Sequence, residues 1–429
     1  MPAVRPRIAI TGIGVVSPYG AGRELYWDSL SRGISATRAI TEFEPQGTCR
    51  VAAPVGDRGT GLDLWKTQER GTEEFSTGRD PSPNADPRRY SRVSRIAVQA
   101  AQEAFEDARL SADEGEIGVV VGSGAGGIEI AERQYGEFFS GEAHRVSPYA
   151  IPVSIVGIVA SEISIALGLR GVSHVLSNGC TSSTDAVGYA AGLIRHGEAD
   201  VLLTGGADAC VTPGMLLGFS RMRVMSSRYN DRPAEASRPF DRGRDGFVLG
   251  EGAWLMTLER EERARARGAR VYATVDGYGS TCDAFHRVQM DPDGVQIVRA
   301  MRLAIERSGR AADDIDYVSY HGTSTQLNDR VEAECVRRLF GARAEQVPGS
   351  SIKSMIGHPQ GASGAAGIVA SALALSRCLA PPTINLTDPD PACGLDFVPN
   401  AARPLRAEAA LCNCLGFGSK NSAIVLGRA

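Results

Sequence analysis

Lysine is almost absent from this chain, since Lys66, Lys353 and Lys420 are the only lysines among its 46 basic residues. Arginine therefore carries nearly all of the positive charge. A lysine that is kept against such a bias is expected to be needed as a compact ammonium, which a planar guanidinium does not replace. Two of the three, Lys353 and Lys420, fall inside motifs described below.

An excess of charge, a metal-ligand motif and a targeting segment are also missing. The 46 basic and 50 acidic residues give a net charge of −4, so nothing points to nucleic acid or a membrane as a partner. The nine cysteines include no Cys-x-x-Cys pair, and no metal site is expected. Their odd number, and strand-like residues 8–10 with no signal peptide before them, predict a reducing cytoplasm.

The 429 residues are too many for one small core and predict two subdomains. Apolar strand-like runs alternate with helical patterns along most of the chain, which indicates a layered α/β fold. This alternation occurs both before residue 259 and after residue 270, as in two similar halves, although no residue-level repeat is visible. Residues 56–87 are rich in Gly, Pro, Ser and acids and predict a surface excursion.

A cysteine lies on a predicted turn between a strand and a helix. Residues 171–176 form a short apolar run, and residues 186–194 repeat apolar and small residues at helical spacing up to a stop at Gly197. Gly179 permits an unusual backbone at the turn, and Cys180 would meet the positive end of the helix dipole, which favours a thiolate. Cys180 is therefore either a nucleophile or, as is commoner for a lone cysteine, a buried structural residue.

A Gly-x-Gly-x-x-Gly run at residues 122–127 follows three valines and resembles a dinucleotide fingerprint. No following strand ends in the acid that a nucleotide site needs about 20 residues on. We therefore interpret these glycines as positions of close backbone approach.

Three further motifs carry chemistry. Residues 321–325, His-Gly-Thr-Ser-Thr, follow an apolar strand at 317–320, where open α/β sheets place sites, although a capping histidine in a turn would look the same. Residues 351–364 place His358 before an apolar core helix, and residues 412–421 form a glycine-rich turn. A thiol, two histidines and a loop offering backbone N–H groups together indicate covalent acyl chemistry with an oxyanion hole.

With these motifs in this order, the chain resembles the β-ketoacyl-acyl-carrier-protein synthases, from Thr-Gly-Ile-Gly at 11–14 to Gly-Phe-Gly at 416–418. The resemblance implies the thiolase fold, a five-layer αβαβα arrangement of two related halves with a dimer interface. It places the nucleophile in residues 1–261 and the other motifs in residues 262–429. It implies substrates carried on the phosphopantetheine arm of acyl carrier protein and no bound cofactor.

The resemblance also implies roles for individual residues. Cys180 is the acylated nucleophile, and neutral His321 and His358 stabilise the enolate as malonyl thioester loses CO₂. Lys353 is the buried lysine of the family, with Glu332 as its partner and Asp329 close by. The remaining roles are the oxyanion hole (N–H of Cys180 and Phe417), the gate (Phe417 and Asp283), the phosphopantetheine contacts (Thr323 and Thr325) and the acyl pocket (Ala125 and Ala150).

Within the family, residues 179–190 and Asn328-Asp329-Arg330 resemble the catalytic subunits of type II polyketide synthases. Such a subunit pairs with a chain-length factor, so a heterodimer is expected ahead of a homodimer. Residues 414–417 and 419–420 depart from the gate motif of the fatty-acid enzymes, so gating cannot be carried over. Chain length, oxidation level and product do not follow from the sequence.

Three other functions remain open. A fatty-acid elongating synthase acting as a homodimer fits the general motifs equally well. A thiolase would explain Gly-His-Pro-Gln-Gly at 357–361, with Cys414 as a second cysteine, but His321 and Lys353 belong to the synthases. A non-catalytic chain-length factor typically lacks the nucleophile, so Cys180 argues against it.

Overall fold

The N-terminal half of the molecule is built on a mixed sheet. The computed structural model describes residues 6–56, 90–111 and 116–429. The sheet runs in the order β1-β8-β7-β5-β6, and β8 is antiparallel to both of its neighbours whereas β7, β5 and β6 are parallel. Its strands are β1 (Ile8–Ser17), β5 (Gly118–Gly122), β6 (Ser173–Leu176), β7 (Val201–Ala209) and β8 (Leu249–Arg260).

The C-terminal half repeats this plan. Its sheet runs in the order β9-β15-β14-β10-β11. If the five main strands of each half are counted along the chain, both sheets have the order first, fifth, fourth, second, third. The pattern of parallel and antiparallel pairing is also the same. An antiparallel pairing of β1 with β9 joins the two sheets into one. The strands are β9 (Ala273–Cys282), β10 (Tyr317–Ser319), β11 (Gly349–Ser350), β14 (Ala409–Gly416) and β15 (Lys420–Arg428).

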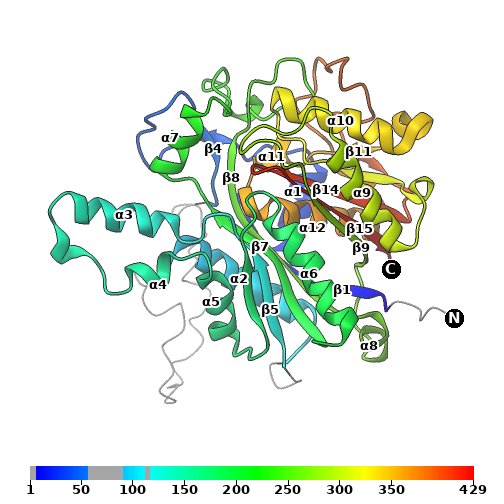
Figure 1. The fold of residues 1–429 in the computed structure, drawn as a ribbon, viewed down its shortest axis with the longest axis horizontal. Helices are drawn as coiled ribbons and strands as arrows, with labels where there is room; N and C mark the ends of the chain where they lie inside the picture. Colours follow the sequence, from blue (N-terminus) through cyan, green and yellow to red (C-terminus); the bar gives the residue numbers. More distant parts are fainter. Residues whose placement is uncertain (1–5, 57–89, 112–115) are drawn as a thin grey trace.

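Helices cover both faces of each half and fill the space between them (Figure 1). Helices α6 (Ser182–His196) and α12 (Ser363–Arg377) pack on each other between the two halves, in the largest hydrophobic core. Helices α2 (Arg92–Asp107) and α5 (Ile158–Leu167) cover the outer face of one half, and α9 (Val295–Ser308) and α10 (Gln326–Phe340) cover that of the other. The predicted five-layer α/β arrangement of two related halves is confirmed, while the boundary between 261 and 262 stays a prediction.

Shorter elements complete the molecule. They are β2 (Gly20–Ala21), α1 (Arg23–Ser31), β3 (Arg38–Ala39), β4 (Val51–Ala53), α3 (Ile128–Phe139), α4 (Ala150–Ser154), α7 (Pro213–Arg221), α8 (Glu261–Ala266), α11 (Lys353–Ile356), β12 (Leu379–Ala380) and β13 (Arg403–Pro404). The excursion predicted at 56–87 lies, beyond residue 56, outside the described residues. In the described part of the chain, none of the helices has the length and apolar character that crossing a membrane requires.

A glycine pair in each half reveals the residue-level repeat that is invisible in the sequence. Gly12 and Gly14 on β1 face α2, and Gly277 and Gly279 on β9 face α9. A Cβ at these glycines would lie 1.8–2.1 Å from a helix carbonyl oxygen, that of Ala104, Ala100, Ala304 and Ala300 respectively. Because no side chain fits in that space, the same Gly-x-Gly spacing sets the helix–sheet distance in both halves.

Candidate active site

Cys180 lies where the sequence predicts it, on the turn between β6 and α6. Gly179 has a φ of +65°, in the left-handed region, and α6 ends at Gly197 with a φ of +78°. The turn is fixed by Asn178, whose backbone N–H donates to the Ser182 hydroxyl at 2.8 Å. The Lys420 ammonium donates to the Asn178 side-chain oxygen at 3.3 Å, so this lysine ties β15 to the nucleophile turn. Cys180 itself is only 6% exposed.

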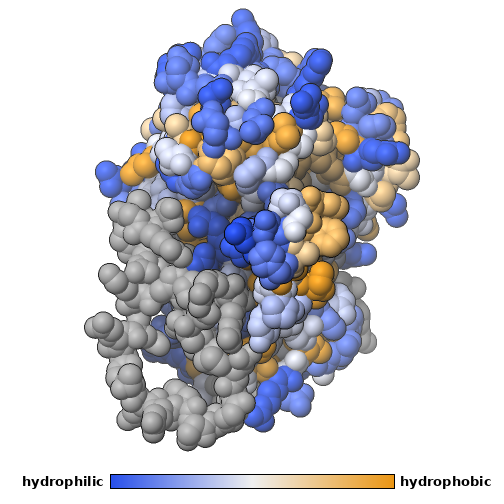
Figure 2. Space-filling model, turned by 90° about the vertical axis from the view of Figure 1, so that its left-hand side faces the viewer, coloured by the Kyte–Doolittle hydropathy of each residue, from blue (hydrophilic) through white to orange (hydrophobic). Residues whose placement is uncertain are grey.

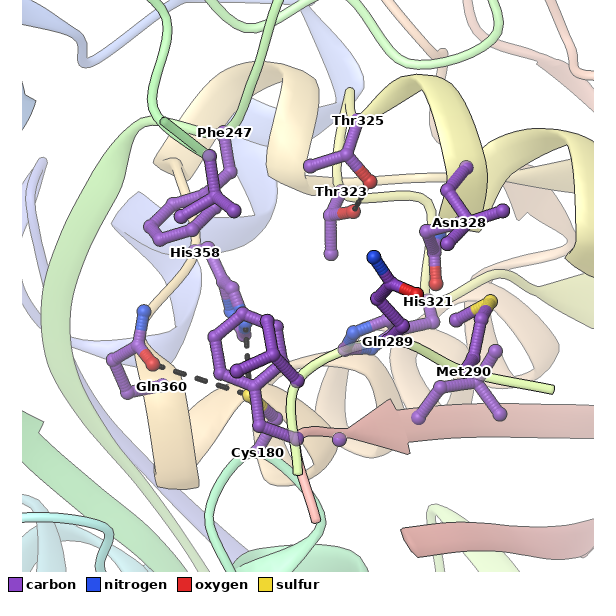
Figure 3. Close-up of a pocket in the computed structure, with 16 residues that line it drawn as sticks. Cys180, Phe247, Gln289, Met290, His321, Thr323, Thr325, Asn328, His358 and Gln360 are labelled. Atoms are coloured by element: carbon purple, nitrogen blue, oxygen red, sulfur yellow. Dashed lines mark hydrogen bonds between the residues drawn. The ribbon is translucent and has the colours of Figure 1, made fainter. Parts of the chain in front are cut away.

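The C-terminal half brings two histidines to this thiol (Figure 3). His358 Nε2 lies 3.2 Å from Cys180 Sγ. The His321 ring, which follows β10, stands edge-on to the His358 ring with 5.3 Å between their centroids. Backbone bonds from His358 N–H to Val248 and from Gly250 N–H to the His358 carbonyl hold that segment against the start of β8. The structure thus brings together all three residues from distant segments.

The thiol of Cys180 is neutral in the resting structure. Burial raises the pKa of Cys180 to about 12, and the neighbouring Cys414 adds to this rise. The charge of Lys353 and the backbone N–H of Phe417 act in the opposite direction but do not offset the burial. The position at the start of α6 predicts a thiolate, but the structure does not favour one. Desolvation of the thiol at this buried turn outweighs the effect of the helix dipole.

Both histidines are neutral as well. Burial is the main cause that lowers the pKa of His321 and of His358 well below 6.5, and the Lys353 charge adds to it. His358 Nδ1 has no hydrogen-bond partner within the described residues, so its tautomer is set by what meets Nε2. A neutral imidazole can accept the thiol proton in one step and donate an N–H in another.

Lys353 and Glu332 are both buried here, but they do not form the expected ion pair. Among the described residues, the Glu332 carboxylate instead accepts the backbone N–H groups of His321 at 2.7 Å and Gly322 at 2.8 Å, and the Asn413 amide at 2.7 Å. Burial raises the pKa of Glu332 to about 7 and lowers the pKa of Lys353. Glu332 therefore fixes the backbone of the His321 loop, a role that the sequence does not reveal.

A second thiol, Cys414, belongs to the site. Its Sγ donates to the Cys180 carbonyl oxygen at 3.1 Å and lies 3.7 Å from His321 Nδ1. The sequence had offered Cys414 only as a mimic of a thiolase cysteine. In the structure it links the nucleophile turn to the His321 ring.

A cavity of about 160 Å³ opens onto these residues. The hydroxyls of Thr323 and Thr325 lie 3.0 Å apart at one side of it, and Phe417 lines it near Cys180. Its other lining residues are Val224, Phe247, Val288, Gln289, Met290, His321, Leu327, Asn328, His358, Gln360, Leu415 and Gly416. Neither Ala125 nor Ala150 is among the residues that line this cavity.

The Phe417 loop is bound to the segment after β9 that carries Asp283. The Asp283 N–H donates to the Ser419 carbonyl at 2.8 Å, and the Asn421 amide donates to the Asp283 carboxylate at 2.6 Å. Gly418 N–H donates to the Arg287 carbonyl at 2.9 Å. The two segments of the predicted gate are therefore in contact.

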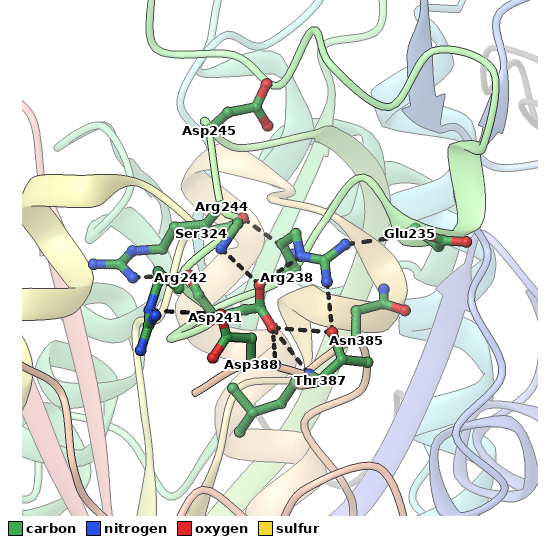
Figure 4. Close-up of polar contacts among 12 residues, drawn as sticks. Glu235, Arg238, Asp241, Arg242, Arg244, Asp245, Ser324, Asn385, Thr387 and Asp388 are labelled. Carbon is green, nitrogen blue, oxygen red and sulfur yellow. Dashed lines mark hydrogen bonds and ion pairs between the residues drawn. The ribbon is translucent and has the colours of Figure 1, made fainter. Parts of the chain in front are cut away.

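A buried polar network, which the sequence does not reveal, holds the Thr323–Thr325 loop from behind (Figure 4). Arg244 is fully buried, lies 3.6 Å from the Asp329 carboxylate and donates to Asp390 at 2.8 Å and to the Thr325 carbonyl at 3.2 Å. Ser324, with a φ of +70°, accepts the Arg238 N–H at 3.0 Å. Residues 238–246 of the N-terminal half thus position a loop of the other half.

Asp208 near the end of β7 is a further buried acid at the site, and it too is missed in the sequence. It accepts the Ser123 hydroxyl at 2.8 Å and the N–H groups of Gly124 at 2.8 Å, Ala125 at 3.2 Å and Gly361 at 2.6 Å. Burial raises the pKa of Asp208 to about 6. The glycine run at 122–127 is therefore a backbone anchor, as its interpretation by close approach predicts.

Comparison with known proteins agrees with this geometry. The models of the N-terminal and C-terminal domains of β-ketoacyl synthase match residues 5–264 and 272–387. The chain is 37% identical over 426 residues to 3-oxoacyl-[acyl-carrier-protein] synthase 2 of Coxiella burnetii, covering 98% of each chain. It is 40% identical over 435 residues to the tetracenomycin polyketide synthase ketoacyl synthase alpha subunit of Streptomyces glaucescens, covering 98% of this chain and 97% of that one.

A solved structure described as the ishigamide ketosynthase/chain length factor is similar as well. It superimposes with a TM-score of 0.87 and 33% identity, over 99% of this chain and 100% of the other. The relatives therefore include both 3-oxoacyl-[acyl-carrier-protein] synthases and polyketide synthase subunits. The percentage of identity does not favour one group over the other. This chain belongs to the β-ketoacyl synthase family, whose members are acyltransferases that form carbon–carbon bonds.

Proposed function

We propose that this chain is the catalytic ketosynthase subunit of a type II polyketide synthase, with Cys180 as the acylated nucleophile. The observation that carries this proposal is the 3.2 Å contact between Cys180 Sγ and His358 Nε2, beside the His321 ring, at a cavity bordered by Thr323 and Thr325. The Asn328-Asp329-Arg330 segment supports the polyketide pathway over fatty-acid elongation.

In the first step the acyl chain moves to Cys180. The thiol proton passes to His358 Nε2 as Sγ attacks the acyl thioester on the phosphopantetheine arm of acyl carrier protein. The carbon–sulfur bond to the arm breaks, and the proton leaves with the released carrier thiol. Because burial disfavours a free thiolate, transfer of the proton during the attack is what activates this cysteine.

In the second step malonyl thioester replaces the released carrier. It loses CO₂, and the N–H groups of neutral His321 and His358 stabilise the enolate oxygen as charge develops. The enolate carbon attacks the Cys180 thioester. As negative charge develops on the thioester oxygen, this oxygen accepts hydrogen bonds from the backbone N–H groups of Cys180 and Phe417. The bond to Sγ breaks, the sulfur leaves as a thiolate and takes a proton from water, and the β-ketoacyl chain leaves on the carrier.

Four side chains extend the proposal to the acyl pocket and the gate. Ala125 does not line the cavity, but Asp208 binds both its N–H and the N–H of Gly361, next to the cavity-lining Gln360, which supports a path for the acyl chain beside Ala125. Ala150 leaves room further on, and Phe417 with Asp283 forms the gate. Products from Ala125→Phe are expected to be shorter, and products of unchanged length would place the chain elsewhere.

Acyl carrier protein and a chain-length factor are the proposed partners. Helix α3 exposes Tyr135, Phe138 and Phe139, the last with 80% of its surface free, and β6 is an exposed strand at the sheet edge. Figure 2 looks onto the side from which α3 and α4 project, and hydrophobic side chains reach the surface there. An exposed apolar helix face and an open sheet edge are each typical of surfaces that another subunit covers.

Two measurements test this proposal. Intact-protein mass spectrometry after incubation with acyl-carrier protein thioesters should show one acyl group on the wild type and none on Cys180→Ala. Efficient acylation by CoA thioesters without decarboxylation would support a thiolase instead. Light scattering of the chain alone and with its genomic neighbour separates the partner models, and full-rate extension by a homodimer would refute the heterodimer.

A further inference from the structure

Gln360 lies next to Cys180, and its side-chain Nε2–H group has no hydrogen-bond partner among the described residues. Its side chain is 8% exposed and lines the cavity, with Oε1 3.9 Å from Cys180 Sγ. Its Nε2 is buried and has no hydrogen-bond partner in the part of the chain that the structure describes. A buried amide left unpaired destabilises the protein, so its retention at an open cavity points to a ligand group that completes it.

The fold holds this amide in place. Gln360 has a φ of +43°, a strained value for a residue with a side chain. The next N–H, that of Gly361, is held by Asp208 at 2.6 Å, and a Cβ at Gly361 would lie 2.3 Å from Gly124 N. The His358 N–H is bound to Val248 at 2.7 Å. Since the backbone is fixed on both sides, rigid neighbours hold the Gln360 side chain at the wall of the cavity.

The position of the amide relative to Cys180 indicates which part of the substrate it meets. Figure 3 shows Gln360 and the two threonines, Thr323 and Thr325, on opposite sides of the His358–Cys180 pair. The carrier arm is proposed to contact those threonines, so Gln360 borders the chain that remains on Cys180. Oε1 lies 3.9 Å from Sγ, and Nε2 belongs to the same planar amide, so the N–H group lies near the first few carbons after the thioester.

We propose that Gln360 is a specificity-determining residue whose amide N–H binds an oxygen atom at C3 of the acyl chain on Cys180. The preferred substrates are then acyl chains that carry a keto or hydroxyl oxygen at C3, rather than fully reduced chains. This inference rests on the proposed function, because it requires an acylated Cys180. A site with an unpaired buried donor rejects an analogue that lacks the acceptor, since the donor then stays unsatisfied.

The test compares three thioesters of equal length, hexanoyl, 3-hydroxyhexanoyl and 3-oxohexanoyl N-acetylcysteamine. Acylation rates of Cys180 are followed by intact-protein mass spectrometry on the full chain with its partner subunit. Wild type is expected to favour at least one oxygenated chain over hexanoyl by at least about tenfold. A preference for both identifies any C3 oxygen, and a preference for 3-oxohexanoyl alone identifies a carbonyl.

The matching variant is Gln360→Leu, which keeps the volume and removes the amide, with Gln360→Met as a second variant should the first not fold. In either variant, the ratio of the acylation rate with an oxygenated chain to the rate with hexanoyl is expected to fall near one. The main reason is that acylation with hexanoyl becomes faster. Gln102→Leu, at a glutamine on α2 that does not line the cavity, should keep the wild-type ratio. Equal rates of wild type on all three chains, or an unchanged ratio without the amide, would overturn this inference alone. No acylation of Cys180 by any thioester, including carrier-bound chains, would overturn the proposed function as well.

Discussion

In both halves of the molecule the strands lie in the same order, yet equivalent loops carry different chemistry. The loop after the third strand presents Cys180 in one half and Lys353 and His358 in the other. The loop after the second strand is the glycine run at 122–127 in one half and the His321–Thr325 segment in the other. The repeated scaffold thus supplies positions, and divergence of its loops supplies a nucleophile on one side and proton-handling groups on the other.

The two halves also use the same device to hold these loops. A buried acid in each half, Asp208 or Glu332, accepts backbone N–H groups of the loop after the second strand. In both cases burial raises the pKa of the carboxyl, to about 6 for Asp208 and to about 7 for Glu332. The two halves are therefore similar in how a buried acid anchors the loop backbone. They differ in the side chains that these loops carry into the site.

The largest expected effect breaks the chemical asymmetry. His321→Ala and His358→Ala should each lower the rate of malonyl-carrier decarboxylation by about 10²–10³-fold, because each removes an N–H donor to the enolate. Measured CO₂ release from malonyl-acyl carrier protein checks this, with His196→Ala, at the exposed end of α6, as the control. Near wild-type CO₂ release by both cavity variants would exclude the histidines from this step.

The second prediction concerns the buried polar network around Arg244, which links the two halves. Arg244→Ala removes the cation beside the fully buried Asp329 carboxylate and beside the partly exposed Asp390, so the free energy of unfolding should fall by about 3–5 kcal/mol. Arg242→Ala is the matched control, since its ion pair with Asp388 is 61% exposed on both sides and should contribute no more than about 1 kcal/mol. Denaturant unfolding measures both, and equal losses would show that the buried network does not hold the loop.

The repeated glycines should respond alike in the two halves. Gly14→Ala and Gly279→Ala each force a Cβ against a helix carbonyl and should cost about 1–3 kcal/mol of stability. Gly218→Ala in α7, where no atom lies within 4 Å of the added Cβ, should instead raise stability by about 0.5–1 kcal/mol. A loss in one half only, in thermal or denaturant unfolding, would show that the pairs are not structural equivalents.

The last expected effect concerns pH. Because the folded pKa of Glu332 lies above its ordinary value of 4.5, its neutral form favours folding, and that contribution is lost as pH rises through about 7. Relative to Glu332→Gln, wild type should therefore lose stability between pH 5 and 7, by at most about 1.4 kcal/mol per pH unit. Calorimetry at several pH values measures this difference, and a difference that grows with pH would contradict it.

Local patterns in the sequence predict much of this molecule. The turn at Cys180 and the stop at Gly197 depend on neighbouring residues alone, so spacing reveals them. His321 and His358 follow apolar strands or precede an apolar helix, which places them at strand ends. The order of these motifs then gives the family and its fold.

The remaining features depend on contacts between distant segments. Asp208 follows the mostly apolar residues 201–206 without a motif of its own, and its partners come from residues 123–125 and 361. The neutral state of Cys180 follows from burial by the other half, which a local dipole argument omits. The free amide of Gln360 becomes visible only once the groups around it are placed.

The central claim is that Cys180 holds the growing chain while the histidines of the other half drive decarboxylation. Cys180→Gln tests it most directly, because the amide imitates an acylated thiol but cannot accept a chain. Release of ¹⁴CO₂ and chain extension are measured separately from labelled malonyl-acyl carrier protein. The account predicts continued CO₂ release with no extension, and chain extension at the wild-type rate would contradict it.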